Sequence, residues 1–176
     1  MKELGFLHYY YGDGKGKTTA AMGLALRAAG RGIPVGIVQF LKDGSSGEIQ
    51  AIQRLPGVTV LAVASLPGFT FTMTAEEKAR CAGEMAENFS RAAASCREGR
   101  WGLLVLDEIG FALDAGMLNR EELLDFLDRR PSGVEVVLTG HRRDPELAER
   151  ADYVTEMRKE KHPYDRGIPA REGIEF

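Results

Sequence analysis

The segment YYGDGKGKTTAA, residues 10–21, constrains the fold of this chain more than any other. It follows a strand-like segment, residues 5–11, and leads into a helical pattern over residues 17–31. A glycine-rich turn between a strand and a helix presents several backbone N–H groups and the positive end of the helix dipole to one anion. We therefore predict a phosphate site, and its nucleotide-binding residues are Gly12, Asp13, Gly14, Lys15, Gly16, Lys17, Thr18 and Thr19.

The loop departs from the usual phosphate-binding pattern, G-x-x-x-x-G-K-[ST], at its first position. Gly16, Lys17 and Thr18 supply the second half of the pattern, but Tyr11 stands where the first glycine belongs. The competing interpretation is a plain glycine-rich turn followed by a helix with an exposed lysine. The strand before the turn and the helix after it favour the phosphate site.

A second candidate feature is LLVLDE, residues 103–108, an apolar strand that ends in two acids. Ligands of α/β sheets bind at the carboxyl ends of the strands, where Asp107 and Glu108 would emerge. Carboxylates there can hold Mg²⁺ directly or through water, and the Thr18 hydroxyl can join them. Taken alone, the two acids could equally be solvated residues at a strand end. Together with the loop they predict a magnesium site of Thr18, Glu108 and Asp107.

Strands and helices alternate along the whole chain. The predicted strands are residues 5–11, 35–40, 58–63, 103–108, 134–139 and 153–157, and the predicted helices are residues 17–31, 47–55, 74–97, 121–130 and 145–150. Thr74 and Glu77 have the spacing of a capping box at the start of the long helix. This alternation predicts an α/β fold with a mainly parallel sheet of about six strands, covered by helices on both faces. We expect a three-layer, P-loop NTPase-like (RecA-like) fold and a single domain spanning residues 1–176.

Charge and composition limit the partners that we expect. The 176 residues carry a formal net charge of −3, so no overall positive field attracts nucleic acid or an anionic membrane. No apolar run approaches the ~18 residues of a membrane-spanning helix, and the first residues, MKELGF, do not resemble a signal peptide. Cys81 and Cys96 form no metal-binding or redox motif, so we expect reduced, packed thiols in a cytoplasmic protein.

Further segments resemble one family, the P-loop type ATP:corrinoid (cob(I)alamin) adenosyltransferases. The resemblance rests on GDGKGKTTAA, LRAAGRG, VGIVQFLK, the Gly47-Glu48 pair, GFTF (residues 68–71), LLVLDEI, RRP (residues 129–131), VVLTG and the closing KHPYDRGIPAREGIEF (residues 161–176). In this family the position of Tyr11 is not glycine either, and ATP is held in reverse relative to ordinary P-loop enzymes. The ribose 5′ carbon, rather than the terminal phosphorus, then faces the acceptor.

The resemblance implies an enzyme that transfers the 5′-deoxyadenosyl group of ATP to the Co(I) centre of a reduced corrinoid and releases triphosphate, in adenosylcobalamin biosynthesis or salvage. It implies Mg²⁺ with ATP, a corrinoid substrate, a homodimer and a reductase that supplies Co(I). No catalytic side chain is needed, because the cobalt is the nucleophile. Lys17 and Lys15 would stabilise the phosphates, and Phe69 and Phe71 would bind the corrinoid. Further nucleotide or magnesium contacts are implied for Arg27, Lys42, Glu48 and Arg142. Arg27 lies about three helical turns from the loop, so a structural salt bridge is an equally good interpretation of that residue.

Two other functions fit the loop and the acids alone. One is a P-loop kinase that acts on a small metabolite, and the other is a nucleotide-dependent switch that controls a partner. The GFTF and closing segments favour adenosyl transfer over both.

Overall fold

The six strands form one parallel sheet in the order β3-β2-β4-β5-β1-β6. The computed structural model describes residues 5–63 and 72–175. The strands are β1 (Leu7–Tyr11), β2 (Val35–Gln39), β3 (Val58–Leu61), β4 (Leu103–Asp107), β5 (Glu135–Gly140) and β6 (Tyr153–Glu156). The predicted α/β class and the parallel sheet are confirmed.

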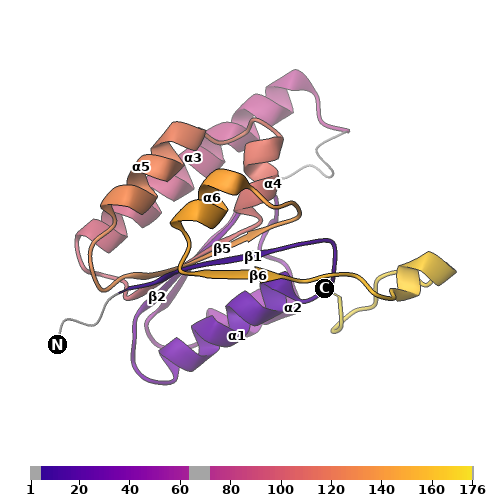
Figure 1. The fold of residues 1–176 in the computed structure, drawn as a ribbon, viewed down its shortest axis with the longest axis horizontal. Coiled ribbons are helices and arrows are strands. Elements are labelled where there is room, and N and C mark those ends of the chain that lie inside the picture. The colour runs from indigo at the N-terminus through magenta and orange to yellow at the C-terminus, as the bar shows by residue number, and fades with distance from the viewer. Residues whose placement is uncertain (1–4, 64–71, 176) are drawn as a thin grey trace.

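Helices cover both faces of this sheet (Figure 1). They are α1 (Lys17–Ala29), α2 (Gly47–Ile52), α3 (Ala75–Arg97), α4 (Ile109–Asp114), α5 (Arg120–Arg129) and α6 (Pro145–Arg150), followed by a 3-10 turn, η1 (Pro163–Arg166). Figure 1 shows α1 and α2 on one face and α3 to α6 on the other. The three-layer arrangement expected from the alternation of strands and helices is therefore present.

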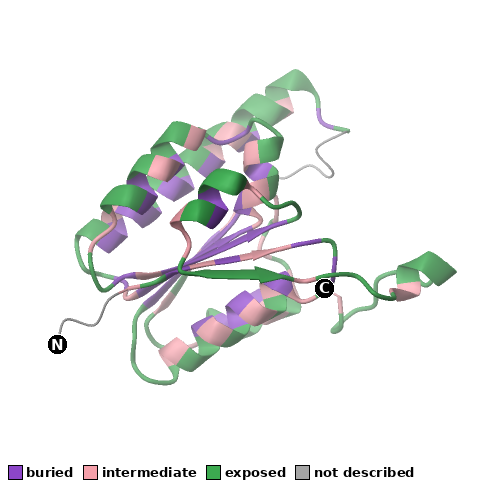
Figure 2. Cartoon of the chain, viewed as in Figure 1, coloured by how far each residue is buried: buried purple, intermediate pink, exposed green. Residues whose placement is uncertain are grey.

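Alternate residues of the central strands feed two hydrophobic clusters. Leu103 and Val105 of β4 pack into the cluster that α1 and α2 contribute to, whereas Leu104 and Leu106 pack with α3 to α6. Figure 2 shows the buried residues gathered between the layers. A strand that is apolar on both sides belongs in the middle of a covered parallel sheet, which explains the unbroken apolar runs of the sequence.

The predicted limits of the elements differ little from the observed ones. The helix predicted over residues 47–55 ends at Ile52, and the strand predicted over residues 58–63 ends at Leu61. The capping box of α3 is present, because Thr74 Oγ1 accepts a hydrogen bond from Glu77 N and Glu77 Oε2 accepts one from Thr74 N. Helix α4 was not predicted, because its six residues directly follow the strand and its acids. Among the described residues, no helix is long and apolar enough to cross a membrane.

Both cysteines are buried thiols that form no disulfide bond within the described residues, as the sequence predicted. Burial raises the pKa of the Cys96 thiol to about 11. Because only the thiolate reacts readily with disulfide reagents, we expect no labelling of the native protein by Ellman's reagent at pH 8. Denaturant should expose both thiols and restore their reaction. Rapid labelling of the native protein would contradict the buried placement of these side chains.

Candidate functional site

The glycine-rich loop connects β1 to α1 at the carboxyl edge of the sheet. Tyr11 is the last residue of β1, pairs with Gly140 of β5 and Glu156 of β6, and stacks on Tyr9 with ring centroids 5.4 Å apart. The left-handed backbone that requires glycine begins one residue later, at Gly12, with φ 121°. Tyr11 therefore fills a strand position, and its side chain does not disturb the turn.

Lys17 lies inside the loop. Its Nζ donates hydrogen bonds to the carbonyl oxygens of Gly12 and Gly14, at 2.7 and 2.8 Å. Burial lowers the pKa of Lys17 from its ordinary value. Gly16, the N-cap of α1, offers no side-chain hydrogen bond to the first turn of the helix. The backbone N–H groups of that turn are therefore available to an anion.

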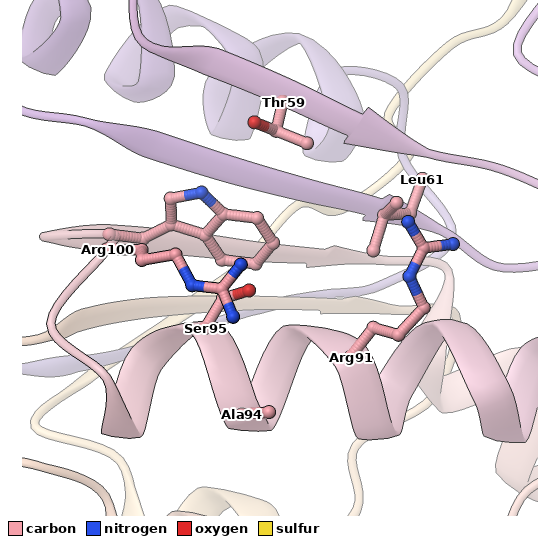
Figure 3. A pocket seen from close by; sticks show the side chains of 7 residues that line it. Thr59, Leu61, Arg91, Ala94, Ser95 and Arg100 are labelled. Carbon is pink, nitrogen blue, oxygen red and sulfur yellow. The ribbon is translucent and has the colours of Figure 1, made fainter.

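A hollow of about 270 Å³ opens beside the loop. It is lined by loop residues 13–19, by Glu108 and His141, and by three residues of the C-terminal tail, His162, Ile174 and Glu175. A separate hollow of about 280 Å³ lies at the β3 edge of the sheet, where Arg91 of α3 and Arg100 line it (Figure 3). No loop residue and neither strand-end acid lines that second hollow, so the first is the candidate site.

Asp107 is the central acceptor of the hydrogen-bond network in the site. It is fully buried at the end of β4, and its two carboxylate oxygens accept four hydrogen bonds. Thr18 Oγ1 and Thr139 Oγ1 donate to Oδ1 at 3.0 and 2.9 Å. Lys42 Nζ and Gln39 Nε2 donate to Oδ2 at 2.8 and 3.3 Å. The Asp107 carboxylate therefore connects α1, β2 and β5 through hydrogen bonds.

Glu108 turns the chain from β4 into α4 and faces the hollow. Its backbone is left-handed, with φ 63°, and its N–H donates to Thr139 Oγ1 at 2.7 Å. Its carboxylate lies 3.3 Å from His141 Nε2 and 4.0 Å from Lys42 Nζ. Burial would raise the pKa of Glu108, but the hydrogen bond from His141 and the nearby positive charges outweigh burial and lower it. Glu108 is therefore an ionised carboxylate beside the loop.

The oxygen groups predicted to contact magnesium lie together. Thr18 Oγ1, Asp107 Oδ2 and Glu108 Oε1 lie 3.2, 2.8 and 4.0 Å from one atom, Lys42 Nζ. A hydroxyl and two carboxylates are the hard oxygen donors that Mg²⁺ binds, usually with several of its waters retained. Within residues 5–63 and 72–175, no group of three or more His, Cys, Asp or Glu side chains forms a metal cage. The residues present thus fit an ion that arrives with other ligands.

The remaining predicted residues are placed differently. Arg27 is in the last turn of α1 and lines another hollow with Phe6 and Ile33, away from the loop. Glu48 lies in the first turn of α2, and its charge contributes to raising the pKa of Lys42. The Arg142 side chain is exposed, while its carbonyl oxygen accepts a hydrogen bond from Tyr9 at 2.5 Å.

Three predicted positions of the loop contact the segment that follows β6. Asp13 Oδ1 accepts from Lys159 N at 3.0 Å, and Lys15 Nζ donates to Ile174 O at 3.2 Å. Gly14 N donates to Met157 O at 2.7 Å, and a Cβ at Gly14 would come within 2.6 Å of that oxygen. The glycine is therefore required by the close approach of the tail. Phe69 and Phe71, the predicted corrinoid contacts, lie outside the described residues.

Sequence reasoning missed Gln39, Thr139 and His141, as well as the three tail residues that line the hollow, His162, Ile174 and Glu175. Gln39 is a polar residue within an apolar strand segment, VGIVQF, and that contrast was the available signal. Thr139 ends a strand that lies directly beside β4, but the order of strands is not evident from the sequence. His141 directly precedes Arg142, which was the residue of this loop that the resemblance implied as a contact.

A Thr139→Val variant tests the buried network. Thr139 is fully buried, and its hydroxyl both accepts from Glu108 N and donates to Asp107. Valine keeps the shape but leaves a backbone donor without its partner, so we expect a loss of about 1–3 kcal/mol of unfolding free energy. Urea denaturation measures this loss. An unchanged midpoint would show that the hydroxyl contributes nothing to the network.

Comparison with known proteins gives a consistent result. A family described as "ATP:corrinoid adenosyltransferase BtuR/CobO/CobP" matches residues 3–176. A corrinoid adenosyltransferase of Pseudomonas aeruginosa is 37% identical over 175 residues, covering 99% of this chain and 85% of that protein. One from Sinorhizobium sp is 36% identical, with 99% and 81% covered, and one from Escherichia coli K12 is 34% identical, with 99% and 87% covered.

Proposed function

Since this chain belongs to the ATP:corrinoid adenosyltransferase family, we propose that its loop and strand-end acids hold the triphosphate of ATP during adenosyl transfer. The enzyme transfers the 5′-deoxyadenosyl group of ATP to the Co(I) centre of a reduced corrinoid and releases triphosphate, in cobalamin biosynthesis. The observation that carries the site assignment is the convergence of Lys17, Thr18 and Glu108 on one hollow. A kinase or a switch would share the loop, whereas the family match extends over nearly the whole chain.

The substrate supplies the nucleophile. The electron pair of Co(I) forms the bond from cobalt to the 5′ carbon, and the bond from that carbon to its oxygen breaks. The electron pair of the broken bond leaves with the triphosphate. Because the cobalt is the nucleophile, the reaction needs none from the protein.

The protein's task is then to orient ATP and to stabilise the charge that develops on the leaving triphosphate. Lys17 lies within the loop, and Lys15 is exposed at its rim, where the nucleotide can displace its contact with Ile174. The first-turn N–H groups of α1 add donors whose direction is fixed by the fold. Donors held in place before the reaction stabilise charge without reorganising.

Thr18, Glu108 and Asp107 are the residues that we assign to Mg²⁺. When bound with ATP, the ion would neutralise part of the triphosphate charge. In this assignment Thr18 and Glu108 would contact the ion directly. Asp107 would not, because its carboxylate already accepts four hydrogen bonds, one of them from Thr18.

Other parts of the proposal follow from the family resemblance. The resemblance implies that Phe69 and Phe71 contact the lower face of the corrin ring, where apolar side chains would keep an axial ligand from the cobalt and ease its reduction. ATP binds with its 5′ carbon toward the corrinoid. We also propose a single domain over residues 1–176, a cytoplasmic location, a homodimer and a reductase that delivers Co(I).

Glu108→Gln tests the metal assignment. We expect the rate of adenosylcorrinoid formation from ATP and chemically reduced cobalamin to fall about 10²-fold, because the amide is a poor Mg²⁺ ligand. The visible absorbance of the product measures the rate, with Glu87→Gln, an exposed acid on α3, as the matched control. Chelation of Mg²⁺ should abolish the wild-type rate. Activity that survives chelation would refute the metal assignment, and wild type that makes no adenosylcorrinoid would refute the function.

A further inference from the structure

The Lys42 ammonium lies where the magnesium site is expected. Its Nζ is 2.8 Å from Asp107 Oδ2, 3.2 Å from Thr18 Oγ1 and 4.0 Å from Glu108 Oε1. These are the three side chains assigned to Mg²⁺, and they come from two separate parts of the chain, the start of α1 and the end of β4. One positive charge therefore already faces every oxygen group of the metal site.

The backbone around this ammonium is held in an uncommon conformation. Among the described residues, only two other than glycine have a positive φ, Leu41 at 55° and Glu108 at 63°. Leu41 directly precedes Lys42, and Glu108 is one of the metal-site acids. Such conformations cost energy in any residue with a Cβ and persist where the surrounding structure imposes them, often at sites of function. Both strained positions flank the same cation site.

Mg²⁺ and this ammonium cannot share the site. A divalent ion within coordination distance of Thr18 Oγ1 and the Glu108 carboxylate would lie within a few ångströms of Lys42 Nζ and would repel it strongly. The Lys42 side chain is 31% exposed and follows the end of β2, so it can swing aside without unpacking the core. The nearest new anion available to it is the triphosphate that enters with the metal.

We propose that Lys42 is the resident cation of the metal site in the nucleotide-free protein and that Mg²⁺ displaces it when ATP binds. The inference rests on the proposed magnesium site and extends it. Before ATP arrives, Lys42 offsets part of the negative charge of Asp107 and Glu108 and keeps free metal ions out. After the exchange, its ammonium contacts the triphosphate and adds positive charge at the leaving group. Lys42 is therefore bound to the acids in the nucleotide-free protein and to the phosphates in the complex.

Mn²⁺ binding to the nucleotide-free protein tests the exchange, with the ion followed by electron paramagnetic resonance. Lys42→Met and Lys42→Gln should bind Mn²⁺ about tenfold more tightly than wild type. The ion must displace Lys42 from Asp107 in wild type, and losing an ion pair of this exposure changes a dissociation constant by up to about tenfold. Lys78→Met, which removes an exposed lysine from α3, should match wild type. Adding Glu108→Gln to Lys42→Met should remove the gain. Circular dichroism verifies that each variant is folded, and Lys42→Gln keeps a hydrogen-bond donor near Asp107.

Calorimetry of ATP binding to wild type, with Mg²⁺ and with a chelator, separates the two proposals. If Mg²⁺ strengthens ATP binding but both Lys42 variants bind Mn²⁺ no more tightly than wild type, the exchange is refuted and the metal site stands. If Mg²⁺ does not affect ATP binding, the metal site is refuted and the exchange with it. Tighter Mn²⁺ binding in both variants, lost again with Glu108→Gln, is the result that we expect.

Discussion

A Lys17→Ala variant is expected to form adenosylcorrinoid about 10²–10³-fold more slowly than wild type, which is the usual cost of removing one preorganised donor from a developing negative charge. The Lys17 ammonium is buried and hydrogen-bonded to the carbonyl oxygens of Gly12 and Gly14. The variant loses the two hydrogen bonds from Lys17 to the loop and the positive charge that faces the triphosphate. The rate is measured with saturating Mg²⁺, ATP and chemically reduced cobalamin.

Lys15→Ala is the matched control for this measurement. Lys15 is exposed and donates a hydrogen bond to the Ile174 carbonyl oxygen, so its removal should slow the reaction by less than about tenfold. Lys17→Arg should not restore activity, because the larger guanidinium does not fit within the loop. Full activity in Lys17→Ala would refute the assignment of this loop to the triphosphate.

Asp107→Ala is expected to cost about 3–5 kcal/mol of unfolding free energy, as well as activity. The fully buried carboxylate accepts from Thr18, Thr139, Gln39 and Lys42. Alanine leaves these donors without a common acceptor and leaves the Lys42 charge beside a cavity. Urea denaturation of wild type and variant at pH 7 gives the difference.

Asp114→Ala provides the comparison for that loss. Asp114 is an exposed acid at the end of α4, and its replacement should change the unfolding free energy by no more than about 0.5 kcal/mol. Equal stability of the two variants would mean that the network around Asp107 does not hold the strand ends together.

The fold was largely predictable because local signals agree along the chain. Apolar strands bounded by glycine, amphipathic helices and the capping box at Thr74 each predicted an element that the structure contains. Helix α4 escaped because it is short and begins within the motif that ended the preceding strand. The order of strands could not be predicted, because it depends on how distant strands pair and not on any local pattern.

The site was predictable where a residue type and its spacing are distinctive. The loop and the two acids are distinctive in this way. The structure connects them by the hydrogen bond from Thr18 Oγ1 to Asp107 Oδ1, two residues that are 89 positions apart in the sequence. Thr139 and Gln39 are ordinary residues whose importance lies in their neighbours, so the sequence alone did not single them out. Lys42 was implied only by the family resemblance, and its place among the metal-site oxygens depends on the pairing of β2 with β4.

The phosphate product formed from ATP tests the central claim most directly. Wild-type protein, Mg²⁺, ATP and chemically reduced cobalamin are mixed, and the products are identified by phosphorus NMR. The account predicts one tripolyphosphate for each adenosylcorrinoid formed, and none when the corrinoid is omitted. ADP as the product, or orthophosphate released without any dependence on the corrinoid, would contradict it, because the bond broken would then lie at a phosphorus and not at the 5′ carbon.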